Sequence, residues 1–373
     1  MNIAIDLTPI PNQKTGVGKY ATVLVEALGE FDRKNQYWIF VRRYHSQDFN
    51  PQKSNFHIVL CPDVLQNGIL RILWEQFCLP FHLFRKKINI LHSIHYTTSF
   101  FAPCKRVVTF HDMTFFLFPE KHTFMKRIFF RFIIPFSARK AKRLIAISES
   151  TKKDIETILG ITADKIDVVY ESIDKIFHPI EKNFATYQVK EKYKIKNNFI
   201  LYVGVIEPRK NIDNLIQAYS KLISENKIRQ QLIIVGKKGW GYHEIFKIIQ
   251  ALSLSEKVIF TGYISEKELV FFYNAADLFV YPSVYEGFGI PPLEALACGT
   301  PVVSSNISSM PEVIGGAGIL VNPRDIEEIS KAILRVLTDR RLREDLRVKG
   351  FERVKEFSRE KLAGEMIRVY EKS

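Results

Sequence analysis

Short apolar runs alternate with longer amphipathic segments along the whole chain, and this alternation restricts the possible folds more than any other feature of the sequence. The apolar runs have the length of β-strands, and helix-like segments separate several of them. Strands that alternate with helices form βαβ units, in which neighbouring strands run parallel. Because two such series occur, we predict an α/β fold made of two doubly wound, Rossmann-like domains. The strand-like runs are MNIAIDL, YWIFVRR, FHIVLC, INILHS, RVVTFHD and RLIAIS in the first half, and NFILYVGVI, QLIIVGK, KVIFTGYI, DLFVYPS and TPVVSS in the second.

A polar, lysine-rich stretch at residues 173–198 separates the two series and is the expected domain boundary. We therefore predict a first domain at 1–180, a second at 181–350, and a C-terminal helical segment at 351–373 that packs on the second domain or crosses back to the first. In open α/β sheets, ligands bind beyond the carboxyl ends of the strands. With two such domains facing each other, the cleft between them is the expected ligand site.

The composition excludes several classes of protein. Of the 373 residues, 46% are hydrophobic and 25% are charged, which is typical of a globular chain and not of a disordered one. The four cysteines lie far apart without zinc-ligand spacing, so neither a disulfide framework nor structural zinc is expected. No apolar stretch approaches the roughly 20 residues that span a bilayer, and the N-terminus does not resemble a signal peptide. The motifs GxGxxG and GxxxxGK[ST] are absent, which argues against nicotinamide-dependent hydride transfer and P-loop hydrolysis.

The segment VYEGFGIPPLEALACGTPVVSS, residues 284–305, places two carboxylates beside a glycine-rich turn. Glu286 lies in the loop after an expected strand, and Glu294 lies in the first turns of an expected helix. Gly287 and Gly289 allow a ligand to approach the backbone, and free N–H groups at a helix start bind anions. These features suit a ligand with hydroxyl groups on both sides of a phosphate, such as a nucleotide-sugar. The alternative is that Glu294 only favours the helix N-terminus and Glu286 only faces solvent.

Basic and imidazole side chains follow other expected strands. Arg209 and Lys210, in GVIEPRKN, stand between a strand and a helix, where they can bind phosphate; the alternative is an exposed basic turn. His111 ends the run VVTFHD and can act in acid-base chemistry near neutral pH, although a lone His-Asp pair at a strand end is more often structural. Gly16, after the first strand, can admit a ligand to the backbone or belong to an ordinary loop.

Basic residues are concentrated in the first half of the chain. The net charge is +14, and residues 1–180 hold 25 Lys and Arg against 16 Asp and Glu. The segment 123–143 has seven basic residues, no acidic one, and interleaved Phe and Ile. As a helix it would present a basic amphipathic surface to a membrane interface. The segment 67–87 is also apolar with a basic end. The alternatives are that both are core-facing helices with solvated edges, and that the charge only keeps the surface soluble.

Taken together, these motifs resemble those of the family 4 retaining glycosyltransferases, which have the GT-B fold. The element EGFGIPPLE, with two glutamates eight positions apart and EPRKN upstream, carries the resemblance. The runs VVTFHD, LIAISES and CGTPVVSSNISSMPEVIGGAGILV match in the same order, over nearly the whole chain. The segments RILWEQFCLP and NILHSIHYTTSF resemble a subgroup with mannosyl- and other hexosyltransferases of bacterial polysaccharide assembly. Two departures are YESID at 170–174, where many members have YNGVD, and Arg359, where tryptophan is frequent.

The resemblance implies a role for each candidate residue. Glu286 would face the donor sugar, and Glu294 would bind the ribose hydroxyls. Arg209 and Lys210 would neutralise the diphosphate of the leaving nucleotide, and His111 would lie near the transferred sugar. Further residues would contact the donor through their backbone or flank its base: Gly16, Gly236, Tyr263, Gly287, Phe288, Gly289 and Ile290.

The implied function is transfer of a hexose, with retention of anomeric configuration, from a nucleoside-diphosphate sugar to a saccharide or lipid-linked saccharide in cell-surface polysaccharide synthesis. GDP-mannose is the first candidate donor, on the resemblance to the subgroup alone. Neither a metal nor another cofactor is expected, and no nucleic acid partner. We expect a cytoplasmic protein, with peripheral attachment to an anionic membrane surface through 123–143. Two alternatives stay open: a nucleotide-sugar epimerase or hydrolase on the same scaffold, and a basic membrane or nucleic-acid adaptor with a vestigial sugar site.

Overall fold

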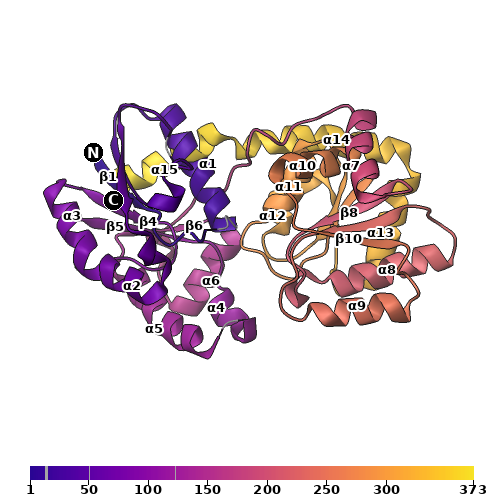
Figure 1. The fold of residues 1–373 in the computed structure, drawn as a ribbon, viewed down its shortest axis with the longest axis horizontal. Helices are drawn as coiled ribbons and strands as arrows, with labels where there is room; N and C mark the ends of the chain where they lie inside the picture. Colours follow the sequence, from indigo (N-terminus) through magenta and orange to yellow (C-terminus); the bar gives the residue numbers. More distant parts are fainter. Residues whose placement is uncertain (13–15, 50, 122) are drawn as a thin grey trace. The chain divides into compact units, whose positions relative to one another are not determined.

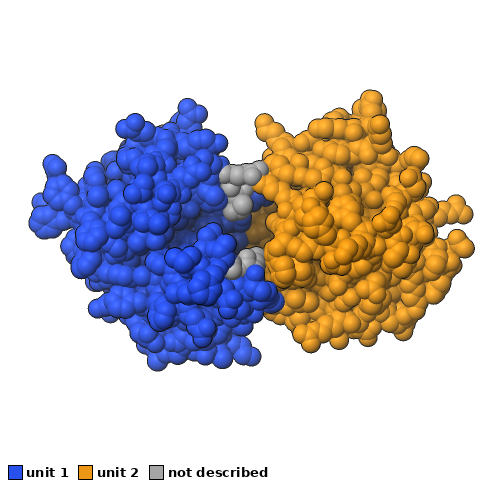
Figure 2. All heavy atoms as spheres, turned by 60° about the horizontal axis from the view of Figure 1, so that its bottom comes forward, with its two compact units in different colours: residues 1–172, 357–373 blue, residues 173–356 orange. Residues whose placement is uncertain are grey.

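Two parallel β-sheets organise the chain in the computed structural model, which describes residues 1–12, 16–49, 51–121 and 123–373. Each sheet belongs to one unit of the chain. The first unit comprises Met1–Ser172 and Phe357–Ser373, and the second comprises Ile173–Glu356 (Figure 2). Every strand pairing described within either sheet is parallel. The fold class predicted from the alternating pattern, two doubly wound α/β units, is therefore confirmed.

The sheet of the first unit has seven strands in the order β3-β2-β1-β4-β5-β6-β7, so the strand order reverses between β1 and β4. The strands are β1 (Asn2–Asp6), β2 (Gln36–Arg42), β3 (Phe56–Cys61), β4 (Ile90–Ser93), β5 (Lys105–Phe110), β6 (Arg143–Ala146) and β7 (Ile166–Val168). The helices are α1 (Gly16–Phe31), α2 (Gly68–Leu73), α3 (Leu79–Arg85), α4 (Thr114–Leu117), α5 (Phe124–Lys140), α6 (Glu149–Leu159) and α15 (Arg359–Lys372). A single π-helical turn, Trp74–Cys78, joins α2 to α3.

The last helix, α15, packs in the first unit although it follows the second unit in sequence (Figure 1). Its Tyr370 hydroxyl lies 2.8 Å from His92 Nδ1 of β4, and Arg359 pairs with Glu26 of α1 at 2.8 Å. Because Tyr370 and His92 are both buried, the C-terminal helix is part of the core of the first unit.

The sheet of the second unit has six strands in the order β10-β9-β8-β11-β12-β13, and its order reverses between β8 and β11. The strands are β8 (Phe199–Val203), β9 (Gln231–Val235), β10 (Val258–Gly262), β11 (Leu278–Tyr281), β12 (Val302–Ser305) and β13 (Ile319–Val321). The helices are α7 (Lys182–Tyr193), α8 (Ile212–Ser224), α9 (Tyr242–Ala251), α10 (Glu266–Ala275), α11 (Ile290–Ala297), α12 (Met310–Ile314), α13 (Ile326–Thr338) and α14 (Arg340–Val354).

Helix α7 occupies the lysine-rich stretch in which we expected the boundary. It packs on α10 through two aromatic contacts, Phe184 with Phe271 and Tyr193 with Phe272, at centroid distances of 5.9 and 5.0 Å. The stretch therefore belongs to the second unit, and the division falls before it, after Ser172.

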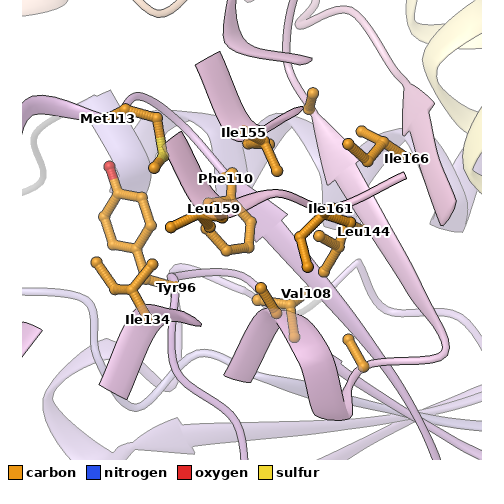
Figure 3. Close-up of a cluster of buried hydrophobic side chains, with 13 residues drawn as sticks. Tyr96, Val108, Phe110, Met113, Ile134, Leu144, Ile155, Leu159, Ile161 and Ile166 are labelled. Carbon is orange, nitrogen blue, oxygen red and sulfur yellow. The ribbon is translucent and has the colours of Figure 1, made fainter. Parts of the chain in front are cut away.

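The strands are nearly continuous apolar runs because helices cover both faces of each sheet. All residues of β8, β9, β11 and β12 are buried. In the first unit, Val108 and Phe110 of β5 and Leu144 of β6 pack against one face of α5 and α6 (Figure 3). Ile134 and Ala138 of α5 and Ile155 and Leu159 of α6 belong to this cluster, and Ile134, Ile155 and Leu159 are labelled in Figure 3.

Candidate active site

The loops that follow β8 and β11 meet where the strand order of the second sheet reverses. β8 and β11 are hydrogen-bonded neighbours, whereas β9 and β12 extend the sheet in opposite directions from them. Ligands of doubly wound sheets bind at such a switch point, beyond the carboxyl ends of the strands. Asn211 ends the first loop in a left-handed conformation, with φ of 56°. Its Nδ2 donates to the carbonyl oxygens of Pro282 and Pro323, at 3.0 and 2.6 Å, and so ties the loops together.

Glu286 binds Arg209 and Lys210, the two cations that the resemblance assigned to the diphosphate. Lys210 Nζ donates to Glu286 Oε1 at 2.5 Å, and Arg209 Nη1 donates to Glu286 Oε2 at 3.0 Å. Tyr281 OH and Ser283 Oγ also donate to Oε1, at 2.9 and 2.6 Å. Only 8% of Glu286 is exposed. The structure therefore joins three sequence-predicted residues in one buried network.

A second carboxylate, Glu207, orients the guanidinium of Arg209. Arg209 Nε and Nη2 donate to Glu207 Oε1 at 3.0 and 2.7 Å. Sequence reasoning missed this residue as a site residue, although it opens the EPRKN motif that contains Arg209 and Lys210. With two carboxylates and two cations, the network is balanced in charge.

The charges of the network decide the protonation of its members. Burial opposes ionisation of Glu286, but the charges of Arg209 and Lys210 outweigh burial and hold the pKa of this carboxyl well below its usual range. Burial, aided by the charge of Arg209, lowers the pKa of Lys210 to about 8 in spite of the attraction of Glu286. At neutral pH the network therefore presents an ionised carboxylate beside two cations.

Two serines of a neighbouring loop hold the backbone around Glu286. Ser308 Oγ accepts a hydrogen bond from Glu286 N at 3.1 Å and donates to Glu286 O at 2.7 Å. Ser309 Oγ donates to Phe288 O at 2.6 Å. Ser308 itself has a φ of 57°, which is uncommon for a residue other than glycine. We did not predict these serines, although both lie in the run SSNISSMPE that carried part of the family resemblance.

Gly236 and Gly289 stand where a side chain does not fit. Gly236, after β9, has a φ of 151°, and a Cβ atom there would lie 1.9 Å from Gly204 O. Gly289 precedes α11 with a φ of 110°, and a Cβ atom would lie 2.1 Å from Met310 Cε. The close approach of the Gly204 backbone thus explains Gly236, whereas the φ of 110° explains Gly289, because the Met310 side chain can move.

The start of α11 has fewer backbone donors than the sequence pattern suggested. Ile290 is the first residue of the helix, and Pro291 and Pro292 follow it. Proline carries no amide hydrogen, so two of the four N–H groups that a helix start normally offers are missing. Any anion site here depends on the loop 287–289 and Ile290 more than on the helix as a whole.

The other candidates of the second unit differ in accessibility. Glu294 is 2% exposed, and its Oε2 accepts a hydrogen bond from Tyr273 OH of α10 at 2.8 Å. Phe288 is buried. Tyr263, after β10, is exposed, and Lys237 Nζ lies 4.8 Å from the centroid of its ring. Tyr263 is thus accessible to a planar ligand, whereas Glu294 faces the interior.

His111 is held by two groups of the first unit. Its Nε2 lies 2.8 Å from Ile94 O, and its Nδ1 lies 3.5 Å from Glu171 Oε1. A carbonyl oxygen only accepts, so Nε2 carries a hydrogen atom. The neighbouring Asp112 accepts, through its Oδ1, hydrogen bonds from Tyr96 OH and from Thr114 at the start of α4. The carboxylate beside His111 is that of Glu171, which belongs to the run YESID at 170–174. This contact was not predicted from the sequence.

Gly16 is the first residue of α1 and is exposed. One turn further along α1, Tyr20 packs edge-on against the imidazole of His111, with 4.9 Å between the ring centroids. The start of α1 is therefore close to the end of β5. Thr15, in the same TGVG run, lies outside the described residues.

The arrangement in the second unit can bind an anion through its cations and a hydroxyl-rich group through its carboxylate. Within the ranges that the structure describes, no three His, Cys, Asp or Glu side chains are placed to hold a metal ion. In those same ranges, no helix has both the length and the apolar character to cross a bilayer.

Comparisons with known proteins identify both units. A family model described as "Glycosyltransferase Family 4" matches residues 14–175, and one described as "Glycosyl transferases group 1" matches residues 183–353. The chain is 30% identical to O-antigen chain mannosyltransferase B of Escherichia coli, over 99% of both chains. It is 28% identical to O-antigen chain mannosyltransferase RfbU of Salmonella typhimurium, over 88% of this chain and 89% of that protein.

Solved structures show the same fold over the full length. Sucrose-phosphate synthase from Thermosynechococcus elongatus superposes with a TM-score of 0.77 at 21% identity, over 100% of this chain and 98% of that one. Anabaena HepE in complex with UDP-glucose superposes with a TM-score of 0.75 at 18% identity, over 100% of both chains. At such low identities the likeness establishes the GT-B fold and nothing about the ligand.

Proposed function

The chain belongs to the family 4 and group 1 glycosyltransferases, and from this premise we propose that it transfers a hexose from a nucleoside-diphosphate sugar to a saccharide or lipid-linked saccharide. Two relatives that match it over 99% and 89% of their length are O-antigen chain mannosyltransferases. Their names support mannose as the hexose, GDP-mannose as the donor and a cell-surface polysaccharide as the product.

The observation that carries the proposal is the buried network of Arg209, Lys210 and Glu286 at the switch point of the second sheet. As the nucleoside diphosphate departs, negative charge grows on its oxygens. Arg209 and Lys210 stabilise that charge where it develops. Glu286 is ionised and accepts hydrogen bonds from sugar hydroxyl groups, which orients the sugar beside the diphosphate. Its role is to position and to stabilise, not to form a bond.

We assign a front-side displacement with retention of configuration. The bond between the anomeric carbon and the diphosphate oxygen breaks, and the acceptor oxygen forms its bond on the same face of the sugar. The proton of the acceptor hydroxyl passes to the departing diphosphate oxygen, so the reaction balances without a protein base. No divalent metal is required in this proposal, because Arg209 and Lys210 supply the positive charge next to the phosphate oxygens.

The test is a transfer assay with the purified protein and lipid-linked saccharide extracted from bacterial membranes. GDP-mannose, UDP-glucose and UDP-galactose are supplied separately, and the product is identified by mass spectrometry, with its anomeric configuration read by NMR. The proposal expects hexose transfer from one donor with retention, and loss of transfer in Arg209→Ala. Arg229→Ala, which changes an exposed arginine of the same unit, is the matched control. Inversion of configuration, or hydrolysis without transfer in the presence of acceptor, would overturn it.

We further propose that the protein works at the cytoplasmic face of a membrane, as a peripheral protein. The basic helix α5 supports this location, since it has five Lys and Arg residues and no acidic residue. No observation favours an epimerase, a hydrolase, or an adaptor with a vestigial sugar site.

A further inference from the structure

Helix α5 buries one face and leaves the other uncovered. Ile134, Ser137 and Ala138 are buried against the sheet of the first unit, and Figure 3 shows Ile134 pointing into that core. On the outer face, Phe124, Met125 and Phe132 are 71%, 76% and 74% exposed. Large apolar side chains with this exposure, gathered on one helix, mark an interaction surface and not a solvated edge.

The apolar face of α5 borders a groove of about 630 Å³ whose lining is almost entirely carbon. Phe100, from the segment between β4 and β5, closes one side, and its ring lies 4.5 Å from that of Phe136, centroid to centroid. The remaining lining residues are Met125, Ile128, Phe129, Phe132 and Ile133, all from α5. A groove of this volume and chemistry fits a hydrocarbon chain.

A second hollow, of about 320 Å³, adjoins the groove at Ile128, which lines both. Arg127 and Arg131 line it, and they lie four residues apart, so both face the same side of α5. Its other walls are Phe115, Phe116, Pro119 and Phe124. None of these described lining residues is acidic, so the two guanidinium groups give the hollow a net positive charge. Guanidinium groups bind phosphate oxygens in a bidentate manner.

The arginine-lined hollow lies at the carboxyl edge of the sheet of the first unit, where β5 ends. Phe115 and Phe116 follow His111 by only four and five residues, and α4, which contains them, begins just beyond the carboxyl end of β5. Helix α5 then runs back toward the start of β6, so Arg127 and Arg131 belong to its first half, near that carboxyl edge. A group held by these arginines is therefore at the same edge of the sheet as His111.

We propose that these two hollows form one binding site for a single-chain lipid phosphate, the anchor of the acceptor saccharide. Arg127 and Arg131 hold the phosphate or diphosphate, the hydrocarbon chain lies along Phe129, Phe132 and Phe136, and the saccharide beyond the phosphate reaches the edge at His111. The proposal rests on the proposed function for the identity of the lipid as acceptor anchor. The site itself rests on the adjacency of the arginine hollow and the carbon-lined groove.

The apolar surface continues past the groove, which indicates how the lipid arrives. Phe101, next to Phe100, stacks with Phe77 at 6.1 Å. Phe77, Phe81 and Phe84 of the segment around α3 are all exposed. A surface of this extent lets the chain leave the bilayer and enter the groove without passing through water.

The test is calorimetric titration of the full-length protein, without nucleotide, with farnesyl phosphate, farnesol and inorganic phosphate. Farnesyl phosphate carries both parts of the ligand, and each of the others carries one. We expect farnesyl phosphate to bind about tenfold or more tightly than either partial ligand. The double variant Arg127→Gln/Arg131→Gln should reduce its affinity to that of farnesol, and Phe132→Ser should weaken farnesyl phosphate and farnesol alike. The matched control, Arg229→Gln, should bind as the unaltered protein does.

Two results would overturn the site: equal binding of farnesol and farnesyl phosphate, or unchanged binding in the double variant. Binding of the unaltered protein and of the double variant to vesicles of phosphatidylglycerol is measured as well. If the double variant loses vesicle binding while free farnesyl phosphate is not preferred over farnesol, the surface is a bilayer anchor and the lipid-phosphate site is wrong. Thermal unfolding of each variant with GDP measures the donor site separately. Farnesyl phosphate binding without any nucleotide binding would keep this site and reject the proposed function.

Discussion

Lys210 Nζ lies 2.5 Å from Glu286 Oε1, although 76 positions separate the two residues in the sequence. Both side chains are buried, and they come from the loops after β8 and β11, which neighbour each other only because the strand order reverses between them. The contact links the topology of the second unit to its chemistry, because it sets the charge of the candidate donor site.

Replacement of Glu286 by glutamine should damage both stability and transfer. The amide keeps the shape of the carboxylate but leaves two buried cations with one carboxylate, Glu207. Breaking a buried ion pair in this way costs about 3–5 kcal/mol, so the free energy of unfolding in urea should fall by about that amount. Transfer by the folded fraction should fall by about 100-fold. The control is Glu327→Gln, which removes one partner of an exposed pair with Lys221 and should leave unfolding and transfer unchanged. Full activity in Glu286→Gln would contradict the assigned role.

Nucleotide affinity should weaken as the pH rises through about 8. Burial, with the charge of Arg209, lowers the pKa of Lys210 to about 8 in the free protein. A bound diphosphate favours the charged ammonium, so binding above this pH must take up a proton, and the dissociation constant should rise by up to about tenfold per pH unit. Titration with GDP at several values between pH 7 and pH 9 measures the effect. Lys210→Met should bind more weakly and lose the pH dependence; a dissociation constant that stays constant in the unaltered protein would refute the prediction.

The same shift has a defined effect on stability. Because the folded pKa of Lys210 lies below the usual lysine value, the unfolded chain holds this proton over a range in which the folded protein has released it. Between about pH 8 and the unfolded lysine pKa of about 10.4, this group therefore makes the folded state more stable as the pH rises. Denaturant unfolding of Lys210→Met and of the unaltered protein isolates that contribution: the difference in their free energies of unfolding should change between about pH 8 and about pH 10.4 and stay constant below about pH 8.

Removal of the serine hydroxyls that hold the Glu286 loop should lower turnover more than binding. Ser308→Ala loses two hydrogen bonds to Glu286, and Ser309→Ala loses the bonds to Glu286 O and Phe288 O. At about 1 kcal/mol for each bond, we expect kcat to fall by about tenfold, with a small change in the GDP dissociation constant. Ser305→Ala is a matched control, since the buried Ser305 hydroxyl has no partner among the described residues. Equal losses in Ser305→Ala and Ser308→Ala would reject a positioning role for Ser308.

Transfer should not depend on a divalent metal. Arg209 and Lys210 supply the positive charge that a metal ion would otherwise provide, so activity after exhaustive EDTA treatment should match that of the untreated enzyme. Addition of Mg²⁺ or Mn²⁺ should not raise it. Loss of activity in EDTA with recovery on adding one of these ions would contradict the proposed mechanism.

Much of the fold could be predicted because each element carries its own local signal. The strand-like run MNIAIDL contains β1, Asn2–Asp6, and the strand-like run DLFVYPS contains β11, Leu278–Tyr281. Helix α7 was not predicted, because its lysines obscure the pattern of the few apolar residues that contact α10. Its aromatic partners Phe271 and Phe272 lie about eighty residues away, where no local pattern can indicate them.

Part of the candidate site could be predicted from the sequence for the same reason. Glu286, Arg209 and Lys210 stand at strand ends, where the α/β pattern locates ligand-binding residues, and the network unites them. Glu207, Ser308 and Tyr281 act through contacts with these residues, which depend on how three separate loops pack. The orientation of Glu294 toward Tyr273 likewise depends on the packing of α10 against α11. Such relationships belong to the tertiary structure and have no counterpart in spacing along the chain.

The most direct test of the central claim is the binding of nucleoside diphosphates, because the network of Arg209, Lys210 and Glu286 is assigned to that group. Calorimetry with GDP, UDP, ADP and dTDP, each with and without EDTA, should find one nucleotide that binds well above the others and is unaffected by EDTA. Its affinity should fall by about tenfold or more in Arg209→Ala and stay unchanged in Arg229→Ala. If no nucleoside diphosphate binds, or if Arg209→Ala binds as tightly as the unaltered protein, the network is not the donor site and the account is wrong.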